Sequence, residues 1–167
     1  MSTLWPDPPL QVVLVEPEIP PNTGNISRSC AATGSRLHLV HPLGFDLSEK
    51  RVRRAGLDYW PHVDLQEHDC LADCLALPHR KVWYLSTKAT RCYSDADFGP
   101  GDMLVFGPET RGLPEDLLKE AGAQALRIPM QTHAVRSLNL ATSVGIVLFE
   151  ALRQCRAAEG PQESKDS

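Results

Sequence analysis

The sequence lacks the signatures of several common protein classes. It contains no apolar run of transmembrane length and no secretory signal peptide, so we expect a cytoplasmic protein without a membrane partner. It has no G-x-x-x-x-G-K-[ST], no G-x-G-x-x-G after its first apolar run and no G-x-S-x-G. These absences exclude an ordinary ATP-binding loop, a dinucleotide-binding domain and an α/β-hydrolase. An excess of positive charge is also missing.

The formal net charge is -4 and the sequence pI is about 5.8. Neutralisation of phosphates is usually the main source of affinity for nucleic acid. The overall charge therefore argues against a protein whose whole surface is basic and binds nucleic acid, although a local basic patch could still bind one.

Cysteine is present in an odd number, which fits reduced thiols better than a disulfide framework. The cysteines are Cys30, Cys70, Cys74, Cys92 and Cys155. A cluster of His68, Cys70, Cys74 and His79 raises the question of zinc, but its spacing matches no standard finger. Cys70 and Cys74 lie one helical turn apart in an apolar-periodic segment. Buried structural thiols are therefore favoured, and no metal is expected.

The length and composition fit one globular domain. The chain has 167 residues, 42% of them hydrophobic and 23% charged, which is enough to bury a core. We expect residues 1–9 to form a proline-rich flexible arm, residues 10–156 the domain and residues 157–167 a polar tail.

Apolar runs alternate with helix-periodic segments along the whole domain. Strands are expected at 10–15, 37–40, 63–65, 81–86, 103–106 and 125–128. Helices are expected from Asn22 or Thr23 to Thr33, with Gly34 as the stop, and at 48–55, 68–77, 114–121 and 138–154. This alternation predicts a single α/β domain with a mainly parallel sheet flanked by helices. In such sheets ligands bind beyond the carboxyl ends of the strands.

The densest positive charge lies in the expected helix 48–55. Its basic residues are Lys50, Arg51, Arg53 and Arg54. They form either a solvated helix face or a surface that contacts phosphates, and the residues alone leave both open.

The loop Phe106-Gly-Pro-Glu-Thr-Arg-Gly-Leu113 follows an expected strand. Gly107 allows a ligand to approach the main chain, and Gly112 permits a dihedral that other residues find strained. Glu109 and Arg111 add one charge of each sign. The loop could bracket an adenine and ribose, or it could be an ordinary turn with a surface ion pair.

The last strand and helix, from Ile128 to Gln154, are joined by a polar loop. Arg136, Ser137 and Asn139 bring donors and acceptors to the helix start, where α/β proteins bind anions and cofactors. The alternative is a capped core helix. Leu138, Ala141, Val144, Leu148, Ala151 and Leu152 recur at helical spacing and predict its buried face.

Three segments, in order and spacing, resemble the three motifs of the SPOUT class of RNA methyltransferases. They are Asn22-Thr-Gly-Asn-Ile-Ser-Arg28, Phe106-Gly-Pro-Glu-Thr-Arg-Gly-Leu-Pro114, and Ile128-Pro-Met with Arg136-Ser-Leu-Asn-Leu140. The segments 16–26 and 50–59 narrow the resemblance to the tRNA (cytidine/uridine-34)-2′-O-methyltransferase family, the TrmL or YibK type. The resemblance covers about 10–154.

The resemblance implies a SPOUT fold with a C-terminal trefoil knot, a homodimer, and transfer of a methyl group from S-adenosylmethionine (AdoMet) to the ribose of the tRNA wobble nucleotide. By motif position Leu85, Gly107, Ile128 and Ser137 would contact AdoMet. The last helix would form much of the dimer interface. The basic helix would bind tRNA.

The resemblance also nominates Arg28 as the group at the 2′-hydroxyl. A guanidinium rarely gives up its proton, so we expect Arg28 to hold the adjacent phosphate and stabilise the developing alkoxide. Ser137 and Asn139 would orient the ribose or cofactor, and Glu109 would orient Arg28 or Arg111.

Two features depart from the family's pattern. The loop between Met130 and Arg136 is one residue longer, and Phe149 stands where a tyrosine is expected. Two other readings remain: a related enzyme that acts on another tRNA position or on rRNA, and a non-catalytic RNA-binding dimer.

Overall fold

The computed structural model describes residues 5–47, 62–131 and 134–159. In this part of the chain seven strands form one sheet in the order β3-β2-β1-β6-β4-β7-β5, and every pairing is parallel. The strands are β1 Gln11–Val15, β2 Arg36–Val40, β3 Leu65–His68, β4 Val82–Leu85, β5 Arg91–Cys92, β6 Met103–Phe106 and β7 Ala125–Arg127. The helices are α1 Pro20–Thr33, α3 Leu71–Leu75, α4 Glu115–Ala121 and α5 Leu140–Ala158, with 3-10 turns η2 Tyr93–Asp95 and η3 Gly122–Gln124. The predicted parallel α/β domain is confirmed.

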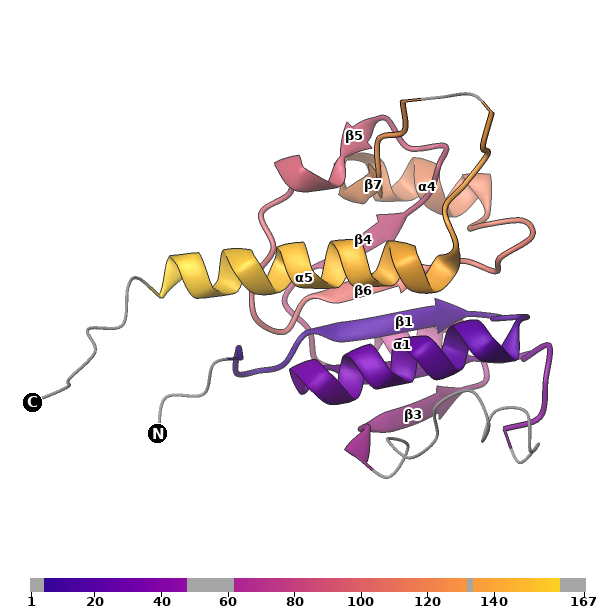
Figure 1. Ribbon diagram of the computed structural model, residues 1–167, viewed down its shortest axis with the longest axis horizontal. Coiled ribbons are helices and arrows are strands. Elements are labelled where there is room, and N and C mark those ends of the chain that lie inside the picture. Colours follow the sequence, from indigo (N-terminus) through magenta and orange to yellow (C-terminus); the bar gives the residue numbers. More distant parts are fainter. Residues whose placement is uncertain (1–4, 48–61, 132–133, 160–167) are drawn as a thin grey trace, which may run out of the picture.

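The sheet is covered on both faces, which is what a parallel sheet requires. Helices α1 and α5 lie side by side on one face, where Ile26 and Leu148 join the larger core cluster (Figure 1). Helices α3 and α4 flank the other face, and Cys74 and Leu113 pack there with Val13 and other strand residues. Burial of all five residues of β1 reflects its central position.

Helix α1 begins earlier than the sequence suggested. Its first residue is Pro20, and Ile19 occupies the N-cap position without a side-chain cap, so the expected cap at Asn22 or Thr23 is wrong. Proline suits the first helical position because its fixed φ is helical and no N–H is needed there. The predicted end is confirmed, since Gly34 adopts the left-handed conformation with φ 63°.

Two elements between β2 and β4 differ from the prediction. Strand β3 runs from Leu65 to His68 instead of 63–65, and α3 covers only Leu71–Leu75 instead of 68–77. His68 pairs with Val40 in the sheet, and Cys70 is extended, so neither belongs to a helix. Pro78 disfavours helical backbone at the residue before it, which explains the early end. The predicted helix 48–55 lies outside the described residues.

Helix α5 begins where the polar loop ends. Asn139 caps it by accepting hydrogen bonds from the N–H groups of Ala141 (2.9 Å) and Thr142 (3.3 Å). Val144, Leu148, Ala151 and Leu152 are buried as predicted. Leu138 is 36% exposed because it precedes the helix, so its place on the buried face was wrong. None of the described helices is long and apolar enough to span a membrane. The trefoil knot stays a prediction from the resemblance.

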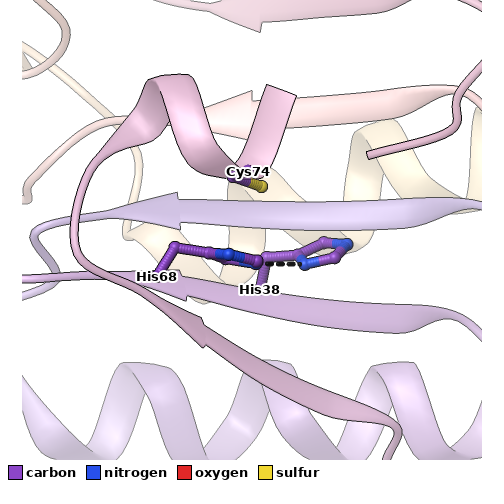
Figure 2. A group of neighbouring side chains, drawn as sticks. All are labelled: His38, His68 and Cys74. Atoms are coloured by element: carbon purple, nitrogen blue, oxygen red, sulfur yellow. Dashed lines mark hydrogen bonds between the residues drawn. The ribbon is translucent and has the colours of Figure 1, made fainter. Parts of the chain in front are cut away.

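The cysteine and histidine side chains do not form the cluster considered from spacing. Cys70 and His79 are exposed, so the expectation that Cys70 is buried was wrong. Cys74 is fully buried, and it lies near His38 of β2 and His68 of β3 (Figure 2). His38 comes from a strand that the spacing argument did not include.

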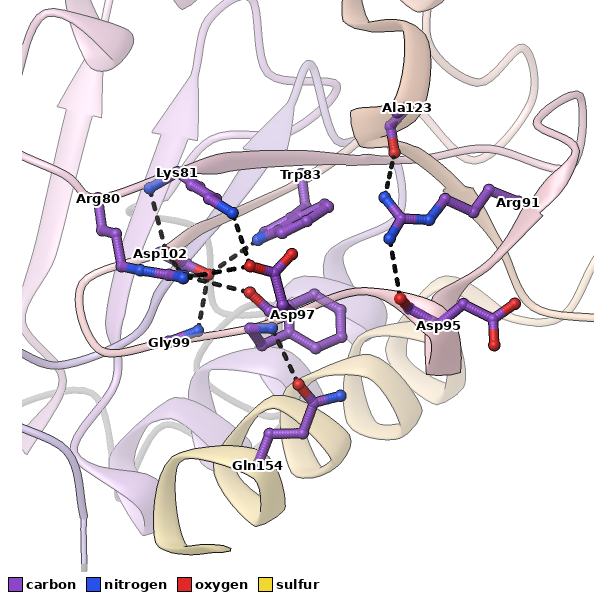
Figure 3. Close-up of polar contacts among 11 residues, drawn as sticks. Arg80, Lys81, Trp83, Arg91, Asp95, Asp97, Gly99, Asp102, Ala123 and Gln154 are labelled. Atoms are coloured by element: carbon purple, nitrogen blue, oxygen red, sulfur yellow. Dashed lines mark hydrogen bonds and ion pairs between the residues drawn. The ribbon is translucent and has the colours of Figure 1, made fainter. Parts of the chain in front are cut away.

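A buried carboxylate organises the amino end of the sheet. Asp102, which precedes β6, is fully buried and accepts hydrogen bonds from Arg80 and Trp83 side chains and from backbone N–H groups (Figure 3). The neighbouring loop is tied to α5 because the Phe98 N–H donates to Gln154 (2.9 Å). This network lies at the end of the sheet opposite the loops that follow the strands.

Candidate active site

A cleft of about 540 Å³ lies beyond the carboxyl ends of β4, β6 and β7. This size is typical of small-molecule sites. The loops that follow these three strands and the starts of α1 and α5 form its walls. The lining residues are Ile19, Asn22, Leu85–Lys88, Phe106–Gly112, Ile128, Met130, Arg136–Leu140 and Ser143.

The loop after β6 forms one wall through close backbone packing. A side chain at Gly107 would place its Cβ 2.4 Å from the Leu113 nitrogen and 2.5 Å from the Gly112 carbonyl carbon. Gly112 has φ 67°, and its N–H donates to the Pro108 carbonyl (2.9 Å). Only glycine at position 107 lets the loop fold back on itself and form this wall of the cleft.

Glu109 supplies the cap that α1 lacks in its own sequence. Its carboxylate accepts hydrogen bonds from the N–H groups of Glu18 (2.8 Å) and Ile19 (3.1 Å) and from the Asn22 amide nitrogen (3.3 Å). A carboxylate at a helix N-terminus is stabilised by the unpaired N–H groups and the helix dipole. These contacts differ from the predicted one, in which Glu109 orients Arg28 or Arg111.

Glu18 makes the reciprocal contact, from the loop after β1 to the loop after β6. Its carboxylate accepts from the Thr110 hydroxyl (2.7 Å) and the Thr110 N–H (3.1 Å), and these bonds lower the pKa of Glu18. Arg111 pairs with Glu16 at 3.2 Å, and Glu16 itself has φ 49°, rare for a residue with a side chain. The loops after β1 and β6 are therefore fixed to each other on both sides. We call these contacts of residues 16–22 with 109–111 the glutamate clasp.

Asn22 extends this network to the third loop. Its side-chain oxygen accepts from the Asn139 amide nitrogen (3.0 Å), while the Asn139 oxygen caps α5. Asn22 is buried, and both bonds to its amide are partly buried because Glu109 and Asn139 reach it from the cleft side. The hydrogen-bonded series Glu109, Asn22 and Asn139 joins the loops after β6, β1 and β7 into one wall.

Cationic side chains surround the mouth of the cleft. Lys88, Arg111 and Arg136 line it and are exposed, although Lys88 pairs with Glu115 at 3.2 Å and Arg111 with Glu16. Exposed pairs of this kind contribute little to stability. The mouth can therefore receive a ligand that carries a carboxylate or phosphate.

The structure brings most of the predicted site residues together. Leu85, Gly107, Glu109, Ile128, Ser137 and Asn139 all line the cleft. Arg28 does not: it is exposed on α1, beyond Asn22 along the helix. Lys50, Arg51, Arg53 and Arg54 lie outside the described residues.

Sequence reasoning missed the parts of Glu18, Asn22 and Thr110. Asn22 stood inside a recognised motif, and its offset from the helix start was the available signal. Glu18 and Thr110 gave none, because their partners lie about ninety residues away in the chain.

The model of the SpoU rRNA Methylase family matches residues 9–149, most of the chain. The chain belongs to this family. The predicted membership of the SPOUT class, to which these methyltransferases belong, is therefore confirmed.

Individual relatives agree with the family match. A tRNA (cytidine(34)-2′-O)-methyltransferase of Methylovorus glucosotrophus (strain SIP3-4) is 50% identical over 145 residues, which cover 86% of this chain and 94% of the relative. A solved structure concerned with the 2-OH methylation of C/U34 on tRNA has 52% identity and a TM-score of 0.81, covering 87% of this chain and 95% of its own. An AdoMet-bound rRNA methyltransferase of Sinorhizobium meliloti has 29% identity and a TM-score of 0.75, covering 86% and 56%.

The cleft fits AdoMet by its own chemistry. Leu85 and Ile128 offer apolar surface from two neighbouring strand ends, and the 107–112 loop offers main-chain groups next to them. An adenine needs this combination of flat apolar contact and backbone hydrogen bonding. The cationic mouth suits the carboxylate of a methionine moiety.

Proposed function

We propose that this protein methylates the ribose 2′-hydroxyl of the wobble nucleotide of tRNA, a cytidine or uridine derivative at position 34, with AdoMet as the methyl donor. The observation that carries the proposal is the cleft, in which all three SPOUT motifs meet through the glutamate clasp and Asn139. About 50% identity to tRNA (cytidine(34)-2′-O)-methyltransferases over most of the chain supports the target.

AdoMet supplies an activated methyl group, so the protein has to align the reactants and manage one proton. Gly107 and the loop behind it hold the cofactor through the backbone, with Leu85, Ile128 and Ser137 as further contacts. Asn139 is committed by its oxygen to α5 and by its nitrogen to Asn22. We therefore assign Asn139 a positioning role: it fixes the loop that carries Ser137.

We assign Arg28 the role of holding the phosphate next to the methylated ribose. It is exposed and lies outside the cleft of its own chain, where a large substrate can reach it. A planar guanidinium can hold a phosphate with two parallel hydrogen bonds and also stabilise a developing alkoxide. Arg28→Lys should lower kcat/KM by about tenfold or more, the effect of losing roughly 1.4 kcal/mol in the transition state. Arg36→Lys, at the start of β2 and at the end of the sheet opposite the cleft, is the matched control, and equal turnover of the two variants would reject this role.

We also propose a homodimer and a basic surface that binds tRNA. A homodimer would bury the exposed face of α5, where Phe149 is 51% exposed. Lys50, Arg51, Arg53 and Arg54 would form the tRNA surface, doubled by the dimer symmetry, and the protein would act in the cytoplasm. Reversing Arg53 and Arg54 to glutamate should weaken tRNA binding and its salt dependence while AdoMet binding is retained. Unchanged tRNA affinity would leave this helix as a solvated face.

The direct test uses tRNA from cells that lack the protein. The tRNA is incubated with the protein and methyl-labelled AdoMet, digested to nucleosides, and the label is located by mass spectrometry. We expect 2′-O-methylation at position 34, and at least about tenfold less of it with the Gly107→Ala variant when AdoMet is below saturation.

The family description names rRNA, so ribosomal RNA is the alternative target. Label in rRNA or at another tRNA position would keep the chemistry and reject the target. Absence of label, although calorimetry shows that AdoMet still binds, would favour a non-catalytic RNA-binding protein.

A further inference from the structure

Three side chains away from the cleft have the composition of a metal site. His38 of β2, His68 of β3 and Cys74 of α3 place their ligand atoms within 4.8 Å of one another (Figure 2). His38 and Cys74 are fully buried, while His68 is partly exposed. None of these three residues lines the cleft or takes part in the proposed reaction.

The strand register places the two histidines on one face of the sheet. Val40 lies opposite His68, and Val40 packs in the same core cluster as Cys74. His38 is two residues before Val40, so it shares that face. Helix α3 then covers both rings with Cys74. Adjacent elements therefore supply the three groups without any rearrangement of the backbone.

Hydrogen bonds made by Gln11 fix the tautomer of His38. The Gln11 amide nitrogen donates to the carbonyls of Pro78 (3.1 Å) and Gly101 (3.2 Å), so its oxygen must face the His38 ring. His38 Nε2, 2.8 Å from that oxygen, must therefore carry the proton and donate it. The Nδ1 lone pair is left facing His68 Nε2 at 2.9 Å. Metal-binding histidines are commonly held in this way by an oxygen on their outer nitrogen.

His68 is partly exposed, so an ion can reach the cluster from solvent on its side, and a released proton can leave by the same route.

We propose that His38 Nδ1, His68 Nε2 and Cys74 Sγ bind one zinc-class divalent cation, with water as the fourth ligand. One thiolate and two imidazoles select zinc or cobalt over magnesium or calcium. Tetrahedral bonds of the usual lengths separate such ligands by roughly 3.3 to 3.6 Å. The two nitrogens need to part by a few tenths of an ångström, and the sulfur, which lies within 4.8 Å of both, needs to be drawn into this range by rotation of the Cys74 side chain.

The binding step releases one proton. The cation forms bonds to both nitrogens and to sulfur, the S–H bond of Cys74 breaks, and its proton leaves to solvent. His68 exchanges its Nε2–H for an Nδ1–H, so the ring stays neutral. The metal would tie α3 and the edge strand β3 to β2, and none of its ligands lines the cleft, so binding is independent of methyl transfer.

The experiment uses the full chain after removal of metal with a chelator. Cobalt is titrated in and followed by the thiolate-to-cobalt charge-transfer absorption, and zinc is measured by equilibrium dialysis with elemental analysis. We expect one equivalent of either metal and a charge-transfer band for the unchanged protein. Cys70→Ser, which changes an exposed thiol nearby, should retain both.

Cys74→Ala should lose the band, and His68→Gln should weaken zinc binding by at least about tenfold. Cys74→Ser, a closer match in size, serves if the alanine variant does not fold, and circular dichroism checks both. Absence of a thiolate band in the unchanged protein would overturn the proposal. A band that survives in Cys74→Ser but disappears in Cys70→Ser would overturn it equally.

Discussion

Replacing Asp102 by asparagine should lower the free energy of unfolding by about 3 kcal/mol. The carboxylate has no exposed surface. One oxygen accepts from Trp83 Nε1 (2.8 Å) and the Gly99 N–H (2.8 Å), the other from the Lys81 N–H (3.1 Å), and Arg80 Nη1 lies 2.9 and 3.0 Å from the two oxygens. An amide has one acceptor oxygen and can satisfy only one side of this network.

The better orientation of the amide keeps Trp83 and Gly99. It then turns an NH2 group toward the Lys81 N–H, which costs about 1 to 3 kcal/mol for a buried unpaired donor. The ion pair with Arg80 is also lost, and its contribution is discounted because the Arg80 side chain is 39% exposed. These two losses give the figure of about 3 kcal/mol.

Urea unfolding followed by circular dichroism measures the change. Asp97→Asn is the matched control, because Asp97 also pairs with Arg80 but its side chain is 65% exposed. Lys81 lowers the pKa of Asp97 through a hydrogen bond at the surface, and such pairs contribute less than about 1 kcal/mol. AdoMet affinity of folded Asp102→Asn should change little, because the cleft is at the opposite end of the sheet. Equal stability of the two variants, or loss of AdoMet binding without loss of stability, would refute this reasoning.

Three further changes probe the cleft. Gly107→Ala should weaken AdoMet binding, measured by calorimetry, by at least about tenfold, because its Cβ would meet the Leu113 backbone; Gly145→Ala, which has open space in α5, should not. Glu109→Ala should lower the free energy of unfolding by about 1 to 2 kcal/mol, as loss of a helix cap does, and equal loss in Glu115→Ala would contradict the clasp. Asn139→Asp should keep the α5 cap but set a carboxylate against the Asn22 oxygen, so AdoMet affinity should fall and the free energy of unfolding should drop by about 1 to 3 kcal/mol; no change in either would disprove the bridge.

Local signals in the sequence predicted the elements that local forces determine. Strand β6 has the predicted bounds, Gly34 ends α1, and Asn139 caps α5. Each depends on residues within a few positions: an unbroken apolar run, a left-handed glycine, an amide before an apolar helix. The two-residue strand β5 was missed because Arg91 and Cys92 carry no periodicity to read.

The errors came from contacts that cross the sheet. Asn22 seemed a suitable cap for α1, but Glu109 caps it from 87 to 91 residues away, and no spacing rule reaches that far. His38 was absent from the histidine and cysteine cluster because a parallel strand, not a short spacing, brings it to His68. Resemblance to a family supplied the residues that line the cleft, but not the bonds among them.

The glutamate clasp has a consequence for when the cleft forms. Glu18 and Glu109 each bind the other's loop, so neither loop has its final shape alone. The loops meet because β1 and β6 are neighbours in the sheet, although β2, β3, β4 and β5 lie between them in the chain. The cleft therefore depends on the β1–β6 pairing, which closes a long stretch of chain and is costly in entropy. A cofactor that binds this cleft binds only chains that have made the pairing, so its binding energy stabilises the least local strand pairing of the sheet.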